Sequence, residues 1–181
     1  MKKKIKLGLL IDPNRKLQEW ENKLFNQIIN SKYCEIKAIF YEPPKIRKKN
    51  YFKRNVLNSL LNLIIQLVEK KFENKNNKKI NLFKSIAKIK IYAERKGYDD
   101  YFNIKDIKKI KEFKLDLILR RDFRIIKGNI LKSAKNGIWS LHHGDNDFIR
   151  GIPPGFWETF FNTPTTGVTL QKINSVLDGG L

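Results

Sequence analysis

The fold is decided by residues 4–41, which read KIKLGLLIDPNRKLQEWENKLFNQIINSKYCEIKAIFY. Lys4–Ile11 is an apolar, strand-like run that ends at an Asp-Pro-Asn turn signal. Apolar residues then recur at three- and four-residue spacing across Leu17–Asn30, which indicates one face of an amphipathic helix. Glu35–Tyr41 is a second strand-like run. A strand, a helix and a strand in this order predict a βαβ unit, with a parallel sheet and a right-handed crossover.

A second alternation of helix and strand patterns lies nearer the C-terminus. Asn103–Phe113 has isoleucines at helical spacing, and Leu115–Arg120 is a third strand-like run. Gly128–Lys135 predicts a short helix, and Gly137–His142 predicts a fourth strand. Open α/β sheets bind ligands at the carboxyl ends of parallel strands, so His142 is expected at the edge that carries the site. The predicted fold class is therefore α/β, with a Rossmann-like open parallel sheet.

Length and composition favour one domain. The chain has 181 residues, of which 41% are hydrophobic, which suffices for one domain with its own core but not for two ordinary domains. Cys34 is the single cysteine, so no internal disulfide can form. The N-terminal apolar run is too short for a signal peptide. These features predict a single-domain cytoplasmic protein over residues 1–181.

The formal net charge of +20 is unevenly distributed. Residues 45–90 hold 14 Lys and Arg against Glu69 and Glu73, a net charge of +12, whereas residues 136–181 have a net charge of −2. An excess of positive charge favours nucleic acid or an anionic membrane as a partner, although a general bias towards Lys, Ile and Asn also explains it. The positive charge lies away from His142 in the sequence.

Residues 45–95 interrupt the strand and helix pattern, and we expect a basic helical insertion there. Apolar pairs across Val56–Val68 indicate an amphipathic helix, which is too short and too polar to span a bilayer. This helix can pack on its own domain, hold a polyanion, or lie on a membrane or partner surface. Residues 73–79 are typical of a solvated loop. No integral membrane segment is expected.

Several common site types are not supported by the sequence. The turn after residue 11 contains no G-x-G-x-x-G and no G-K-[ST], which argues against a dinucleotide fingerprint or a phosphate loop. His142, His143 and Asp145 resemble a metal-ligand set, but neighbouring strand side chains point to opposite faces, so no metal site is expected. Ser140 has no nucleophile-elbow sequence around it.

The C-terminal residues fit another kind of site better than these, in which a carboxylate keeps a histidine protonated. Asp178, in a glycine-flanked turn, is the best candidate for the carboxylate that orients His142. A protonated imidazole can donate to an oxyanion that develops on a carbonyl oxygen. This chemistry suits acyl or formyl transfer, although a His and an Asp so far apart in sequence can also be structural.

Ordered motifs from Leu115 to Gly180 resemble the catalytic half of the formyltransferase family, in a divergent branch. This family includes methionyl-tRNA, glycinamide ribonucleotide and sugar-nucleotide N-formyltransferases. The resemblance implies the formyltransferase fold, and it also implies C-terminal truncation, because the family continues beyond the motif that ends at Gly180. The motifs, in order, are Leu115-Asp116-Leu117-Ile118-Leu119, Ile130-Leu131, Gly137–His142, Arg150-Gly151, Thr166-Gly167-Val168-Thr169 and Leu177-Asp178-Gly179-Gly180.

The resemblance also implies roles for individual residues. His142 and Asp178 match the catalytic histidine and aspartate, and Ser140 stands where the family has a catalytic asparagine. The implied donor is 10-formyltetrahydrofolate. The residues expected to bind its pterin are Phe123, Arg124, Ile125, Ile126, Val176 and Leu177, and those expected near the acceptor are His143, Asn146 and Arg150.

Ser140 is the main departure from the family pattern. A hydroxyl is shorter than an asparagine amide and reaches the formyl oxygen only through water or a shifted substrate. Either activity is reduced, or Asn146 or His143 substitutes for the amide.

Three functions follow from these features. The first is formyl transfer to an amino sugar in glycan biosynthesis, favoured by the divergent motif and by a site region that is not basic. The second is formylation of methionyl-tRNA, favoured by the basic insertion, since neutralised phosphates would supply affinity for tRNA. The third is a non-catalytic, formyltransferase-like binding domain, favoured by Ser140. A further domain after Leu181 is expected on the same resemblance.

Overall fold

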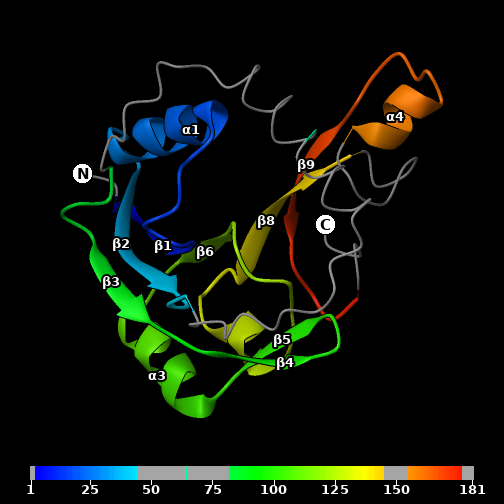
Figure 1. Ribbon diagram of the computed structural model, residues 1–181. Helices are drawn as coiled ribbons and strands as arrows, with labels where there is room; N and C mark the ends of the chain where they lie inside the picture. Colours follow the sequence, from blue (N-terminus) through cyan, green and yellow to red (C-terminus); the bar gives the residue numbers. More distant parts are fainter. Residues whose placement is uncertain (1–2, 45–63, 65–81, 145–154, 177–181) are drawn as a thin grey trace. The chain divides into compact units, whose positions relative to one another are not determined.

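The computed structural model describes residues 3–44, 64, 82–144 and 155–176 (Figure 1). The chain divides into two compact units, one formed by residues 1–43 and 83–181 and the other by residues 44–82. The helix expected across Val56–Val68 lies outside the described residues except for Ile64, which is helical, and the loop expected at 73–79 lies outside them entirely.

The larger unit is built on a six-stranded sheet with strand order β3-β2-β1-β6-β8-β9. β1, β2, β3, β6 and β8 are mutually parallel, and β9 is antiparallel to β8. The predicted open parallel sheet is therefore confirmed, with one antiparallel edge strand added. The strands are β1 (Ile5–Leu10), β2 (Cys34–Tyr41), β3 (Ala87–Lys90), β6 (Leu117–Arg120), β8 (Ile138–His143) and β9 (Val168–Lys172).

Helices α1 (Glu19–Ile29) and α3 (Ile104–Glu112) lie on opposite faces of this sheet (Figure 1). α1 connects β1 to β2, which confirms the predicted βαβ unit. α3 buries Ile107 and Ile110 in the main core cluster, where they join Phe40 of β2 and Ile118 of β6. Alternate strand residues face opposite sides of the sheet, and β1 and β2 bury consecutive residues over 7–10 and 38–40.

A small second sheet lies beside the main one and has strand order β4-β5-β7. Its strands are β4 (Ala93–Lys96), β5 (Asp99–Phe102) and β7 (Ile125–Ile126). β5 is antiparallel to β4 and parallel to β7. The sequence did not reveal this sheet, because its strands are four residues or fewer, and β4 and β5 are rich in charge.

β3 and the first three residues of β4 fall within residues 45–95, where the sequence indicated an insertion. β3 reads Ala-Lys-Ile-Lys and three of its four residues are exposed, as suits an edge strand. In the sequence, the alternating lysines of β3 therefore look the same as the basic residues that precede the strand.

Two short helices complete the described chain. Gly128–Lys135, expected as a short helix, contains a 3₁₀ helix over Gly128–Lys132. α4 (Phe156–Phe160) exposes aromatic rings that pack on one another, including Phe156 and Phe160 with ring centroids 6.1 Å apart.

Candidate functional site

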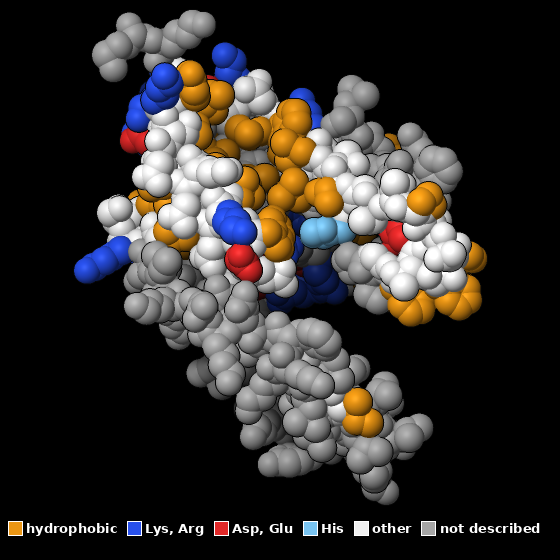
Figure 2. Space-filling view, turned by 90° about the horizontal axis from the view of Figure 1, so that it is seen from above, with side chains coloured by type: hydrophobic (Ala, Val, Ile, Leu, Met, Phe, Trp, Pro, Cys, Tyr) orange, Lys and Arg blue, Asp and Glu red, His pale blue; other side chains and the backbone are white. Residues whose placement is uncertain are grey.

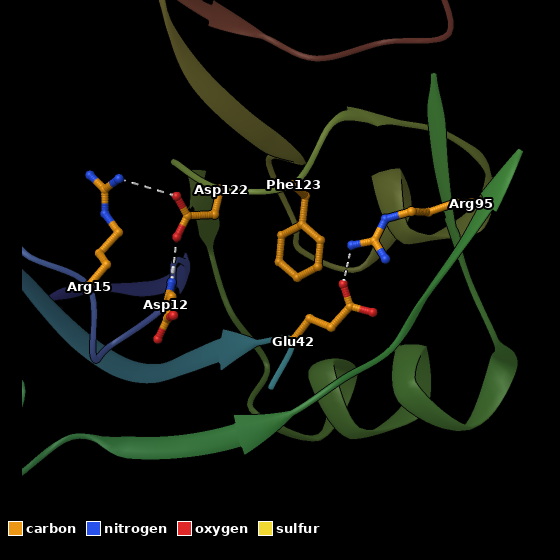
Figure 3. A pocket seen from close by; sticks show the side chains of 6 residues that line it. All are labelled: Asp12, Arg15, Glu42, Arg95, Asp122 and Phe123. Atoms are coloured by element: carbon orange, nitrogen blue, oxygen red, sulfur yellow. Dashed lines mark hydrogen bonds and ion pairs between the residues drawn. The ribbon is translucent and has the colours of Figure 1, made fainter. Parts of the chain in front are cut away.

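A cavity of about 330 Å³ lies where β1, β2 and β6 end (Figure 3). Because these strands are parallel, the residues that follow them meet at one edge of the sheet. We call this the edge cavity. It is lined by Asp12 and Arg15 after β1, Glu42 after β2, Asp122 and Phe123 after β6, and Arg95 from β4.

Both arginines of the edge cavity are held by carboxylates. Arg15 pairs with Asp122 across 3.5 Å and also with Glu21 of α1, whose side chain is fully buried. Arg95 pairs with Glu42, and its Nε lies 3.7 Å from the buried Asp100. The guanidinium groups are therefore fixed in place and their charge is compensated.

Asp12 differs from the other acidic residues of the edge cavity. Its Oδ1 accepts a hydrogen bond of 2.9 Å from the backbone N–H of Asn14, and its own N–H donates to Asp122. Within the described residues no ion pair forms at the Asp12 carboxylate. The lining therefore presents three carboxylates and two guanidiniums.

The predicted catalytic strand ends beside this edge. Arg120, the last residue of β6, pairs with Ser140, so β8 continues beyond β6 through Leu141, His142 and His143. His142 lies opposite Thr169 of β9, which brings the Thr166–Thr169 motif next to the histidine. Figure 2 shows histidine side chains (pale blue) beside Lys and Arg side chains that lie deeper in the surface.

Arg120 connects the end of β8 to the edge cavity. Its Nη1 donates to the buried Ser140 Oγ across 3.3 Å, and its Nη2 donates to the Phe123 carbonyl oxygen across 2.9 Å. Phe123 has a φ of 72°, a left-handed conformation that is unusual for a bulky residue. Sequence reasoning missed Arg120, because it reads as the end of an apolar strand.

His143 lies apart from Ser140 and His142. Its ring packs edge-on against Trp20 of α1, with ring centroids 5.9 Å apart. Neighbouring strand residues face opposite sides of the sheet, so Ser140 and His142 share one face and His143 lies on the other. The structure therefore does not bring His143 to Ser140, and the idea that it substitutes for a missing amide is not supported by its position.

The residues expected to bind a pterin come from two segments that the structure brings together. Lys127 Nζ donates to the carbonyl oxygen of Ser175, which joins the segment after β7 to the one that precedes Val176. The Phe123 ring packs edge-on against Phe102 and also lines the edge cavity. Val176 is exposed.

The second sheet includes Ile125 and Ile126, and Arg124 is hydrogen-bonded to it. Arg124 N donates to Asp100 Oδ2 across 2.8 Å, and Ile125 and Ile126 form β7. Ile126 is buried in the core. Phe123 is therefore the member of this predicted set that lines the edge cavity.

Four predicted site residues lie outside the described part of the chain: Asn146, Arg150, Leu177 and Asp178. The pairing of His142 with Asp178 stays a prediction. In the described residues no group of three or more His, Cys, Asp and Glu is arranged to hold a metal ion. None of the described helices combines the length and apolar character needed to cross a bilayer.

The sheet order, the crossover helix and the site at the carboxyl ends of the strands define an α/β protein with the formyltransferase fold. Glycinamide ribonucleotide transformylase 1 from Symbiobacterium toebii superposes with a TM-score of 0.56 and 11% identity, over 98% of this chain and 69% of that one. The phosphoribosylglycinamide formyltransferase of Anaplasma phagocytophilum has a TM-score of 0.53 and 15% identity, over 98% and 69% of the two chains. The Bacillus halodurans enzyme of the same name has a TM-score of 0.52 and 12% identity, over 97% and 75%.

A sequence relative points to the same family. The chain is 31% identical over 102 residues to the methionyl-tRNA formyltransferase of Prochlorococcus marinus (strain MIT 9312). This match covers 56% of the chain but 30% of that protein's length. No protein-family model matches the chain. The predicted resemblance to formyltransferases, as a distant one, and the predicted formyltransferase fold are confirmed.

Proposed function

We propose that this protein is an enzyme that transfers a formyl group from 10-formyltetrahydrofolate to a primary amine, the amine of an amino sugar in glycan biosynthesis. The observation that carries this proposal is the position of His142 on the part of β8 that projects beyond β6, in a chain with the formyltransferase fold. A cytoplasmic location is part of the same proposal, since the sequence has a single cysteine, Cys34.

The donor would supply an activated formyl group, and the chain would supply placement and charge. Val176, on the segment that Lys127 bridges, is apolar and exposed, which suits a pterin ring. Ser140 and His142 lie on one face of β8, beyond the point where Arg120 ends β6. This arrangement fits a donor held between the segment that ends at Val176 and the end of β8.

In the proposed reaction the acceptor nitrogen forms a bond to the formyl carbon, and the bond between that carbon and the folate nitrogen breaks. His142 donates a hydrogen bond to the formyl oxygen, where negative charge develops. Asp178 holds the protonated His142 and takes up a proton from the attacking amine. The amine loses one proton and the folate nitrogen gains one, so the products are a formamide and tetrahydrofolate.

The test is release of tetrahydrofolate from 10-formyltetrahydrofolate with an amino-sugar nucleotide, methionyl-tRNA or glycinamide ribonucleotide as acceptor. We expect turnover with the amino-sugar nucleotide, and a loss of about 10²- to 10³-fold in kcat for His142→Ala. Lys88→Gln, on the exposed edge strand β3, is the control that keeps wild-type turnover. Unchanged turnover by the histidine variant, with its fold intact by circular dichroism, would refute the assigned role.

Methionyl-tRNA is the second candidate acceptor. It is favoured by the similarity to the Prochlorococcus protein and by the net charge of +12 over residues 45–90. Each phosphate neutralised by Lys or Arg makes binding more salt dependent, so tRNA affinity should fall steeply with salt concentration. Charge reversal at Lys45, Arg47 and Lys48 should then flatten that dependence, whereas a flat response of the wild type removes tRNA as the acceptor.

A non-catalytic, formyltransferase-like binding domain is the remaining alternative. The turnover assay distinguishes it, because such a protein would show no turnover with any of the three acceptors, and calorimetry measures its binding of tetrahydrofolate. Failure to bind tetrahydrofolate as well would remove the enzymatic proposal altogether.

A further inference from the structure

The edge cavity has a lining that selects for a particular ligand chemistry. Asp12, Glu42 and Asp122 present carboxylate oxygens, Arg15 and Arg95 present guanidinium groups, and Phe123 presents an aromatic ring. These six residues come from four separate points of the chain, as Figure 3 shows. The cavity is thus formed by the fold and not by one loop.

A phosphate group is a poor match for this lining. Arg15 pairs with Asp122 and with the buried Glu21. Arg95 pairs with Glu42 and with the buried Asp100. The lining side chains together carry one more negative than positive charge. An anion would therefore face the carboxylate of Asp12, which no described residue pairs with, and would have to displace existing ion pairs.

A hydroxyl-rich ring matches the same lining well. Each hydroxyl is both a donor and an acceptor, so it can donate to a carboxylate and accept from a guanidinium in one place. The Phe123 ring provides an apolar wall for the C–H face of such a ring. A volume of about 330 Å³ is at the small end of ligand sites, about 300–1,000 Å³, which suits one ring and not a whole nucleotide.

We propose that the edge cavity binds the hydroxyl-bearing ring of a sugar and not a phosphate group, with Asp12 as the residue that determines its specificity. As the acceptor's sugar ring, this ligand rests on the proposed function. The carboxylate of Asp12 accepts hydrogen bonds from the sugar hydroxyls, since one of its oxygens is fixed by Asn14 N–H and no ion pair from the described residues competes for it. The two ion pairs supply fixed donors around the ring.

The test measures binding of D-glucosamine, D-galactosamine, D-mannosamine and inorganic phosphate by saturation-transfer NMR, with no folate present. We expect at least one of the sugars to bind at millimolar concentration, and phosphate not to compete with it. Asp12→Asn should weaken that sugar about tenfold, because a bond to a charged acceptor is replaced by a neutral one. Asn14→Ala is the matched control, since the bond to Asp12 comes from its backbone N–H and survives the change.

Glu42→Gln is a second variant, in case Asp12→Asn does not fold, and it should weaken the same sugar. The proposal is overturned if none of the three sugars binds, if phosphate displaces the bound sugar, or if the folded Asp12 and Glu42 variants bind the sugar as the wild type does. Formyl transfer is assayed separately. Sugar binding without transfer would leave the cavity assigned and refute the enzymatic role, and transfer without sugar binding would do the reverse.

Discussion

At the scale of single residues, the Arg120 side chain links the end of β8 to the segment that follows β6. One guanidinium donates to both the Ser140 hydroxyl and the Phe123 carbonyl oxygen, on two different segments. The planar guanidinium presents donors in fixed directions, which a lysine ammonium does not. Arg120 is therefore a positioning residue, which acts through Ser140 and Phe123.

Replacing Arg120 with lysine tests its two hydrogen bonds, to Ser140 and to Phe123. Arg120→Lys keeps the positive charge but cannot reach both acceptors in the same geometry, so we expect the free energy of unfolding to fall by about 1–3 kcal/mol. In the proposed reaction kcat should fall about tenfold, because positioning of the reacting groups is lost.

Urea unfolding and steady-state kinetics check both expectations. Lys108→Gln, an exposed change on α3, is the control that should leave both quantities as they are. A lysine variant that matches the wild type in stability and in kcat would show that the bidentate link has no role.

At the scale of elements, the start of α3 is fixed by a small polar network. The Asn103 side chain accepts from Asp106 N across 2.8 Å and donates to Asp106 Oδ2. Asp106 also accepts from Tyr92 N across 3.0 Å and from Lys109 Nζ across 2.7 Å. The network ties the first turn of α3 to the segment that enters the second sheet.

The pKa of Asp106 makes this network pH dependent. Burial raises the pKa of this carboxyl, but the hydrogen bonds from Lys109, Tyr92 and Asn103 together outweigh burial, and the pKa lies below its usual value. A carboxyl with a lowered pKa in the folded state contributes stability above its unfolded pKa of about 3.9, and this contribution is lost as pH falls through the folded pKa.

Asp106→Asn should therefore destabilise the fold by about 1–3 kcal/mol at about pH 7, and the difference should shrink as pH falls below about 4. Chemical unfolding across this range measures it. Asp99→Asn on β5 is the control, because the Asp99 side chain forms no such network within the described residues. A loss that stays constant with pH would contradict the assigned cause.

Elements buried on both faces could be predicted from the sequence, and edge elements could not. Leu9 and Leu10 of β1 are both buried, so an unbroken apolar run indicated the strand. β9 has exposed Val168 and Leu170 at the sheet edge, and its five residues gave no strand signal beyond the Thr-Gly-Val-Thr motif. The position of His142 at the end of β8 was predicted because helix and strand patterns alternate up to that point.

The edge cavity could not be predicted in the same way. Asp12, Glu42 and Asp122 lie far apart in sequence, and each is an ordinary turn residue until parallel strands bring their ends together. The one available signal was that each follows a predicted strand within a few residues. Which polar residues at strand ends then line a cavity depends on side-chain packing, which strand patterns do not specify.

At the scale of the whole molecule, the net charge of +20 complicates any test with an anionic ligand. Tetrahydrofolate carries glutamate carboxylates, and a strongly basic chain attracts such groups without a specific site. Salt separates the two kinds of binding, because exposed charges are screened within about 3 Å at 1 M ionic strength, whereas a pterin enclosed by side chains is held mainly by contacts and hydrogen bonds.

We therefore expect tetrahydrofolate to raise the thermal midpoint of unfolding even in about 1 M sodium chloride. A ligand at 100 times its Kd stabilises the folded state by about 2.7 kcal/mol, which for a chain of this length corresponds to a rise of about 5–10 °C. p-Aminobenzoylglutamate carries the same carboxylates without the pterin, so it should raise the midpoint at low salt only. Equal shifts from both compounds, or a tetrahydrofolate shift that disappears at high salt, would mean that the chain binds these anions through its charge and has no pterin site.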